Sequence, residues 1–136
     1  MSIKPLKIEG TEFTPYIYLK SGCMQIEGRA ILEDSIDFFS PILKWTEEYI
    51  KNPEDKTVLK INLQVYDSSV NRRFIELFNL LEKITTQNKK VYVYWFYDPD
   101  DSISLQKGYE FASVYNLDFR FIPQRFDNTN DYDIKC

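Results

Sequence analysis

The chain has 136 residues, of which 43% are hydrophobic and 16% aromatic, so it can bury a core of its own. Lys and Arg number 17 against 21 Asp and Glu, and this net charge of −4 argues against nucleic acid or an anionic membrane as partner. The absence of histidine removes Ser-His-Asp and Cys-His catalysis and the commonest ligand for zinc or iron. We expect one folded domain over residues 1–123, a polar tail at 124–136, and no bound metal or cofactor.

The N-terminal residues show no apolar core of a signal peptide, and no apolar run approaches the length needed to span a bilayer. The four glycines form no nucleotide-binding motif. These features together favour a cytoplasmic protein without a nucleotide cofactor.

Short apolar runs bounded by turn residues predict three strands near the N-terminus, at Leu6–Glu9, Tyr16–Leu19 and Met24–Glu27. The last two are close enough to form an antiparallel hairpin, with Gly22 in its turn. Gly28 and Arg29 are then expected to lead out of the sheet.

Residues Glu33–Lys51 have the apolar spacing of a helix that Asp34 or Ser35 can cap. Pro41 interrupts the pattern. It either kinks one helix or starts a second one, with Ser40 as the cap of the second helix.

The central stretch Thr57–Ile84 changes its period once. Apolar and polar residues alternate over Val58–Tyr66, which predicts a strand. From Val70 onward one helical stripe is apolar, formed by Val70, Phe74, Leu77, Phe78, Leu81 and Ile84. Asp67, Ser68 and Ser69 lie between the two elements and favour a helix N-cap.

The rest of the chain alternates strand and helix. Lys90–Tyr97 is almost continuously apolar, which indicates a strand covered on both faces. A helix from about Ser102 to Tyr115 and a strand at Leu117–Ile122 follow. This alternation predicts an α/β fold with a mixed sheet, an N-terminal antiparallel hairpin, and helices packed on the sheet.

Ser68 and Ser69 are the first candidate site. Residues of this kind before a helix are usually caps and nothing more. A phosphate on either hydroxyl would also be stabilised at a helix N-terminus, and Arg72 and Arg73 in the first turn suit phosphate oxygens. A regulatory phosphorylation site and a simple cap therefore remain alternatives.

Asp98, Asp100 and Asp101 form a second candidate site at the end of the aromatic strand. Carboxylates at that edge of an α/β sheet can bind magnesium, as in receiver domains and aspartate-dependent phosphatases. The same residues also suit a turn containing Pro99 and the N-cap of the next helix. A magnesium-dependent receiver or phosphatase is thus the alternative function.

Four segments in this order resemble the SiaC-type bacterial regulatory phosphoproteins, small domains similar to the anti-sigma-factor antagonists of the STAS class. They are IEGTEFTP at Ile8–Pro15, IEGRAILEDSIDFFSPILKWTEEYI at Ile26–Ile50, LQVYDSSVNRRFIELFNLLEKI at Leu63–Ile84 and VYWFYDPDD at Val93–Asp101. The resemblance implies a STAS-like α/β domain that is a signalling switch and not an enzyme.

The resemblance also implies partners. A Ser/Thr protein kinase phosphorylates the residue after the central strand, here Ser68 with Ser69 as its neighbour, and a PP2C-type phosphatase removes the phosphate. The unphosphorylated form binds and activates a diguanylate cyclase, which links this partner switching to cyclic-di-GMP and biofilm regulation. Beside the serines we expect Tyr66, Asn71 and Arg72 to bind the partner.

Two positions depart from the pattern of that family. Asp67 stands where the family usually has Asn, and Val70 stands where a small polar residue is common. Because Asp67 would repel a phosphate on Ser68, the phosphorylated state is expected to be less favourable in this chain.

Overall fold

A mixed six-stranded sheet forms one layer of the structure, a computed structural model that describes residues 3–125. Three helices form the other layer. In chain order the elements are β1 (Leu6–Ile8), β2 (Tyr16–Lys20), β3 (Cys23–Ala30), α1 (Ser35–Tyr49), β4 (Lys56–Tyr66), α2 (Ser69–Thr85), β5 (Lys90–Tyr97), α3 (Ser102–Val114) and β6 (Asp118–Pro123).

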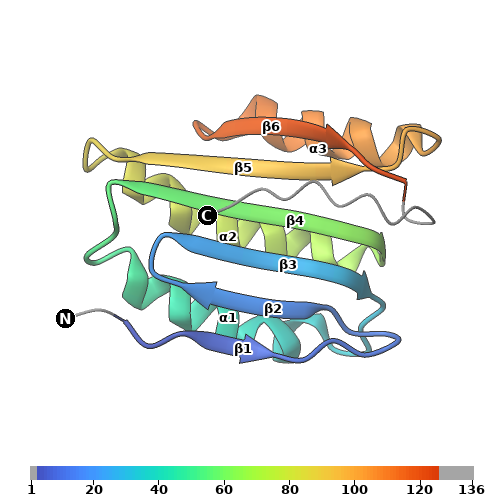
Figure 1. Cartoon of the computed structure of the whole chain (residues 1–136), viewed down its shortest axis with the longest axis horizontal. Helices are drawn as coiled ribbons and strands as arrows, with labels where there is room; N and C mark the ends of the chain where they lie inside the picture. The colour runs from blue at the N-terminus through green and yellow to red at the C-terminus, as the bar shows by residue number, and fades with distance from the viewer. Residues whose placement is uncertain (1–2, 126–136) are drawn as a thin grey trace.

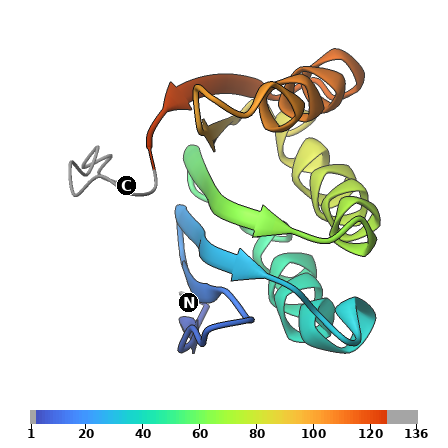
Figure 2. The ribbon, with the colours of Figure 1, turned by 90° about the vertical axis from the view of Figure 1, so that its right-hand side faces the viewer.

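The strands lie side by side in chain order, from β1 to β6 (Figure 1). β1, β2 and β3 pair antiparallel, whereas β3 to β6 pair parallel. Parallel neighbours joined by right-handed crossovers that all step in one direction must carry their helices on the same face. Figure 2 shows α1, α2 and α3 together on one face of the sheet. The predicted mixed α/β fold with its N-terminal hairpin is confirmed.

Glycine permits two irregular points, one in the hairpin turn and one near the end of β3. Gly22 turns β2 into β3 with a φ of +85°, as the sequence predicted. Gly28 has a φ of +114°, and the register between β3 and β4 shifts between Gly28 and Arg29. The prediction that these two residues leave the sheet was wrong, because the bulge lets β3 continue to Ala30.

α1 is one helix and not two. Asp34 is its N-cap, and the Asp34 carboxylate accepts a hydrogen bond of 3.0 Å from the backbone N–H of Asp37. Pro41 lies inside the helix on its exposed side. The alternative in which Ser40 caps a second helix is therefore wrong.

β5 has helices on one face only, contrary to the prediction from its apolar sequence. Val91, Val93 and Trp95 are buried, while Tyr92 and Tyr94 on the opposite face remain partly exposed. The Tyr92 ring has the ammonium of Lys56 at 5.3 Å and the guanidinium of Arg120 at 5.4 Å from its centroid. Tyrosine tolerates such a half-exposed place because it is amphipathic, so its presence does not require a second covering layer.

The core lies between the helices and the sheet and is centred on Phe74 of α2. Phe74 is fully buried, and its ring packs against five other aromatic rings. They are those of Phe39, Tyr66, Phe78, Trp95 and Phe111, with ring centroids 5.7–6.2 Å away. The side chain of Tyr66 thereby ties the end of β4 to the core.

Among residues 3–125, no helix combines the length and the apolar character that crossing a bilayer requires. β6 ends at Pro123. Of the polar tail predicted at 124–136, the part from residue 126 onward lies outside the described residues.

Candidate functional site

Ser68 lies in the short loop that joins β4 to α2, which we call the serine loop, and Ser69 is the first residue of α2; both are exposed. Because β3, β4 and β5 are parallel, the loops at their carboxyl ends gather at one edge of the sheet, on the right of Figure 1. The β4–α2 loop therefore neighbours both the segment that leads from β3 to α1 and the loop that leads from β5 to α3.

The two serines differ in their hydrogen bonds. Asp67 provides the cap, since its Oδ1 accepts from the backbone N–H of Ser69 at 3.1 Å and from the Ser69 hydroxyl. Ser68 is at the N-cap position with helical backbone angles, but its side chain makes no capping hydrogen bond. The alternative in which the hydroxyl merely caps α2 is therefore wrong for Ser68.

The second carboxylate oxygen of Asp67 accepts a hydrogen bond of 2.8 Å from the backbone N–H of Leu32. Burial works to raise the pKa of Asp67, but the hydrogen bonds from Ser69 and Leu32 outweigh it and hold that pKa below its ordinary value of 3.8. Asp67 is therefore ionised at neutral pH and joins the serine loop to the segment before α1.

Asp67→Ala leaves the N–H groups of Leu32 and Ser69 without these acceptors, so we expect a loss of about 1–2 kcal/mol in unfolding free energy at neutral pH. A group whose pKa is lowered by folding stabilises the protein above its unfolded pKa, and this stabilisation is lost as the pH falls through the folded pKa. Urea unfolding at about pH 7 and about pH 3 should show a smaller difference from wild type at the lower pH. Asp55→Ala, at an exposed loop position, is the control, and an undiminished difference at low pH would contradict the assignment.

Ser68 opens onto a groove of about 350 Å³ between the end of β4 and the starts of α2 and α3. We call it the serine groove; it is lined by Leu63, Gln64, Val65, Tyr66, Ser68, Asn71, Asp101, Ile103, Ser104 and Lys107. Two of its apolar side chains face solvent, since Val65 is 39% exposed and Ile103 is 77% exposed. Exposed apolar side chains around a polar hydroxyl suit a surface that a partner protein covers.

Tyr66 and Asn71, two of the predicted partner-binding residues, line the serine groove beside Ser68. Burial raises the pKa of Tyr66 to about 12, and the negative charges of Asp101 and Glu110 add to this effect. Its hydroxyl therefore remains a hydrogen-bond donor at neutral pH. The Asn71 Oδ1 is buried and has no hydrogen-bond partner among the described residues.

The two arginines of the first turn of α2 lie differently from one another, and only for Arg73 is the prediction of a phosphate contact wrong. Arg73 is buried, and its guanidinium pairs with Glu76 at 3.1 Å, so it is not available to a phosphate on the serine loop. Arg72 is exposed one helical turn after Ser68 but does not line the groove. The cation of the groove is Lys107 of α3, which also pairs with Glu110 at 3.2 Å. The alternation of strands and helices in the sequence favours parallel pairing of β4 with β5. This pairing places the start of α3 beside the start of α2, so the alternation is the sequence signal that could have indicated Lys107.

The three carboxylates after β5 have separate partners, since Asp98 and Asp101 bind the local backbone and Asp100 binds a distant side chain. Asp98 accepts from the N–H of Asp100 at 2.9 Å, and Asp101 caps α3 by accepting from Ile103 and Ser104. Asp100 pairs with Arg125. Within residues 3–125 no three side chains of His, Cys, Asp or Glu are grouped so that they could hold a metal ion. The geometry thus favours the turn and cap over a magnesium site.

Known proteins share this architecture. Residues 8–124 match the sequence profile of the SiaC family regulatory phosphoproteins. An uncharacterized protein of Pseudomonas aeruginosa (strain UCBPP-PA14) is 24% identical over 124 residues, which cover 90% of this chain and 97% of that protein. The crystal structure of apo-SiaC from Pseudomonas aeruginosa is similar with a TM-score of 0.79 and 22% identity, over 88% of this chain and 99% of that chain.

A second similar structure is the complex of the diguanylate cyclase SiaD with its activator SiaC from the same species. It gives a TM-score of 0.78 at 22% identity, over 88% of this chain and 99% of the matched chain. At such identities the likeness establishes the fold. The sequence match extends from the first strand to just beyond the last one, so this chain belongs to the SiaC family of regulatory phosphoproteins.

Proposed function

We propose that this protein is a cytoplasmic switch without enzymatic activity, which binds and activates a diguanylate cyclase while Ser68 is unphosphorylated. A Ser/Thr kinase adds the phosphate, and a PP2C-type phosphatase removes it. The level of cyclic-di-GMP, and with it biofilm formation, would follow the state of Ser68. Membership of a regulatory phosphoprotein family supports this proposal, as does the relative whose structure is described as an activator bound to a diguanylate cyclase.

One observation carries the choice of residue. The hydroxyl of Ser68 is exposed and makes no capping hydrogen bond, whereas the Ser69 hydroxyl already donates to Asp67. A kinase can therefore reach Ser68 without breaking a bond that holds the loop. Ser69 would have to give up its bond to a carboxylate, and its phosphate would then face that carboxylate directly.

The position of Ser68 also supplies a mechanism. A phosphate adds a charge of about −1.5 to −2 to the serine groove. A partner that covers the exposed Val65 and Ile103 of this groove would bury that charge. Burying about two negative charges beside a single cation, Lys107, is costly, so the partner is released without any change of the backbone.

The phosphorylated state itself is compatible with the fold. The N-terminus of α2 and the ammonium of Lys107 favour an anion at this place, whereas the ionised Asp67 opposes it. The opposing carboxylate accounts for our expectation that the phosphate is held less firmly than it would be with Asn at position 67.

The test is incubation with the Ser/Thr kinase of the same organism, followed by intact-mass measurement and mapping of the modified residue. We expect one phosphate on the wild type and on Ser69→Ala, and none on Ser68→Ala. Ser69→Ala is the matched control because it removes a neighbouring hydroxyl of the same kind. Undiminished labelling of Ser68→Ala would overturn the assignment.

A further inference from the structure

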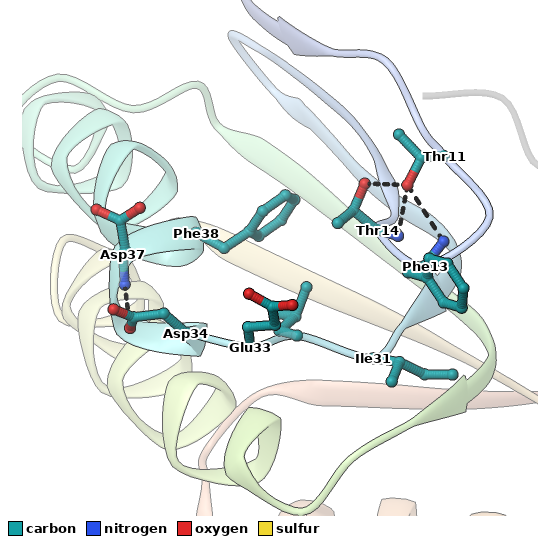
Figure 3. Close-up of a pocket in the computed structure, with 9 residues that line it drawn as sticks. Thr11, Phe13, Thr14, Ile31, Glu33, Asp34, Asp37 and Phe38 are labelled. Atoms are coloured by element: carbon teal, nitrogen blue, oxygen red, sulfur yellow. Dashed lines mark hydrogen bonds between the residues drawn. The ribbon is translucent and has the colours of Figure 1, made fainter.

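A second groove lies on the other side of the serine loop, between the loop before β2 and the start of α1. Its volume is about 560 Å³, and Figure 3 shows its two walls. We call it the acidic groove. Its carboxylates come from Glu33, Asp34 and Asp37, and its principal apolar side chains are Phe13, Ile31 and Phe38.

None of the three carboxylates forms an ion pair with a described residue. Asp34 and Asp37 also belong to the cap and first turn of α1, where acidic residues stabilise a helix. Glu33 precedes the cap, is exposed, and has no such role. The groove therefore carries more negative charge than the start of the helix requires.

Hydrogen bonds fix the backbone of the two segments that carry Phe13 and Ile31. The hydroxyls of Thr11 and Thr14 are 2.7 Å apart, and the N–H of Thr14 donates to the Thr11 hydroxyl at 2.9 Å. The carbonyl of Phe13 accepts from the N–H of Ile31 at 2.8 Å. With its backbone fixed in this way, Phe13 still has 54% of its surface exposed, and Ile31 has 39%. The groove is thus preformed, which lowers the entropy cost of binding.

We propose that the acidic groove docks a basic amphipathic helix of a partner protein, with its apolar face against Phe13 and Ile31 and its lysines or arginines against Glu33 and Asp37. Charge complementarity selects this occupant, since an acidic segment or an anionic membrane would be repelled. The inference rests on the proposed function, because the helix would belong to the partner that Ser68 controls.

The hydrogen bond between Leu32 and Asp67 places the docking groove next to the switch. Leu32 lines the acidic groove, and Asp67 immediately precedes Ser68. A partner seated in the acidic groove is therefore close to the serine loop. The acidic groove would thus bind the partner in both states of Ser68, whereas the serine groove beside it would bind the partner only while Ser68 is unphosphorylated.

The first test is an NMR titration with a synthetic helical peptide of about 18 residues, with leucines on one face and lysines on the other. A peptide with glutamates in place of the lysines is its control. We expect saturable amide shifts at Phe13, Ile31 and Leu32, and an affinity at least about tenfold higher for the lysine peptide. Equal affinity for both peptides, shifts confined to other surfaces, or concentration-dependent shifts without peptide, which indicate a second copy of the chain in the groove, would each overturn the proposal.

A matched pair of charge reversals separates this groove from general attraction to an acidic protein. Glu33→Lys should weaken the lysine peptide severalfold, whereas Glu47→Lys, an exposed position near the other end of α1, should change it little. Equal effects of the two variants would contradict a specific groove.

The same two variants, tested for binding to the diguanylate cyclase, distinguish the inference from the proposed function. If wild type and Glu33→Lys bind the cyclase equally, the groove proposal is wrong and the proposed function stands. If neither wild type nor variant binds the cyclase while the lysine peptide still titrates the groove, the proposed function fails and the groove remains.

Discussion

Ser68→Glu is expected to weaken binding of the diguanylate cyclase at least about thirtyfold, equivalent to about 2 kcal/mol. The added carboxylate would lie at the serine groove, which Val65, Ile103 and Asp101 also line, and directly after Asp67 in the chain. A partner that covers these apolar side chains would remove water from the new charge. Among the residues that line the groove, only Lys107 is a cation that can compensate this charge. Calorimetric titration of purified cyclase with the variant measures the effect.

Asn79→Glu is the matched control for this experiment. It adds the same charge on an exposed position of α2, about 16 Å further along the helix axis. We expect it to bind as wild type does. If both variants lose the same affinity, net charge and not the position of Ser68 controls the partner.

Phe74→Ala is expected to lower the unfolding free energy by about 3–5 kcal/mol. Phe74 is fully buried and contacts rings from α1, β4, α2, β5 and α3, so no single neighbour can move to fill the space it leaves. Since domains of this size have about 5–15 kcal/mol of stability, much of the total would be lost. Urea unfolding followed by tryptophan fluorescence measures the change, because the Trp95 ring lies 5.9 Å from that of Phe74.

Phe13→Ala is the control for the same measurement. It removes the same ring from a half-exposed position, so we expect a change of about 0.5 kcal/mol or less. A loss below about 1.5 kcal/mol for Phe74→Ala would show that the surrounding aromatic side chains repack, and that the core is less tightly determined than its contacts suggest.

Local patterns predicted most of the fold because each element carries its own signal. The change of period between Val58–Tyr66 and the stripe from Val70 marks β4 and α2, and Gly22 marks the hairpin turn. The errors arose where tertiary packing overrides local signals. The register with β4 shifts at Gly28 but β3 does not end there, and Pro41 is accommodated on the exposed side of α1. The tyrosines of β5 made a strand with helices on one face resemble a fully covered one.

Of the residues at the serine groove, only those close to Ser68 in the chain could be predicted from the sequence. The sequence places Ser68, Tyr66 and Asn71 together because they are close in the chain. It does not show that Asp67 caps the helix through Ser69, or that its carboxylate also binds Leu32, 35 residues away. Lys107 and Asp101 reach the groove through the pairing of β4 with β5, and Arg73 is withdrawn from it by burial. Such placements depend on long-range packing, which the local spacing of residues does not encode.

The most direct measurement of the switch uses one sample in two states. The protein is phosphorylated on Ser68 by the kinase, titrated against the diguanylate cyclase, then treated with the PP2C-type phosphatase and titrated again. We predict that the phosphorylated form binds at least about a hundredfold more weakly, equivalent to about 2.8 kcal/mol, and that dephosphorylation restores the affinity in full. Equal affinity in the two states, with the phosphate verified on Ser68 by mass, would contradict the switch.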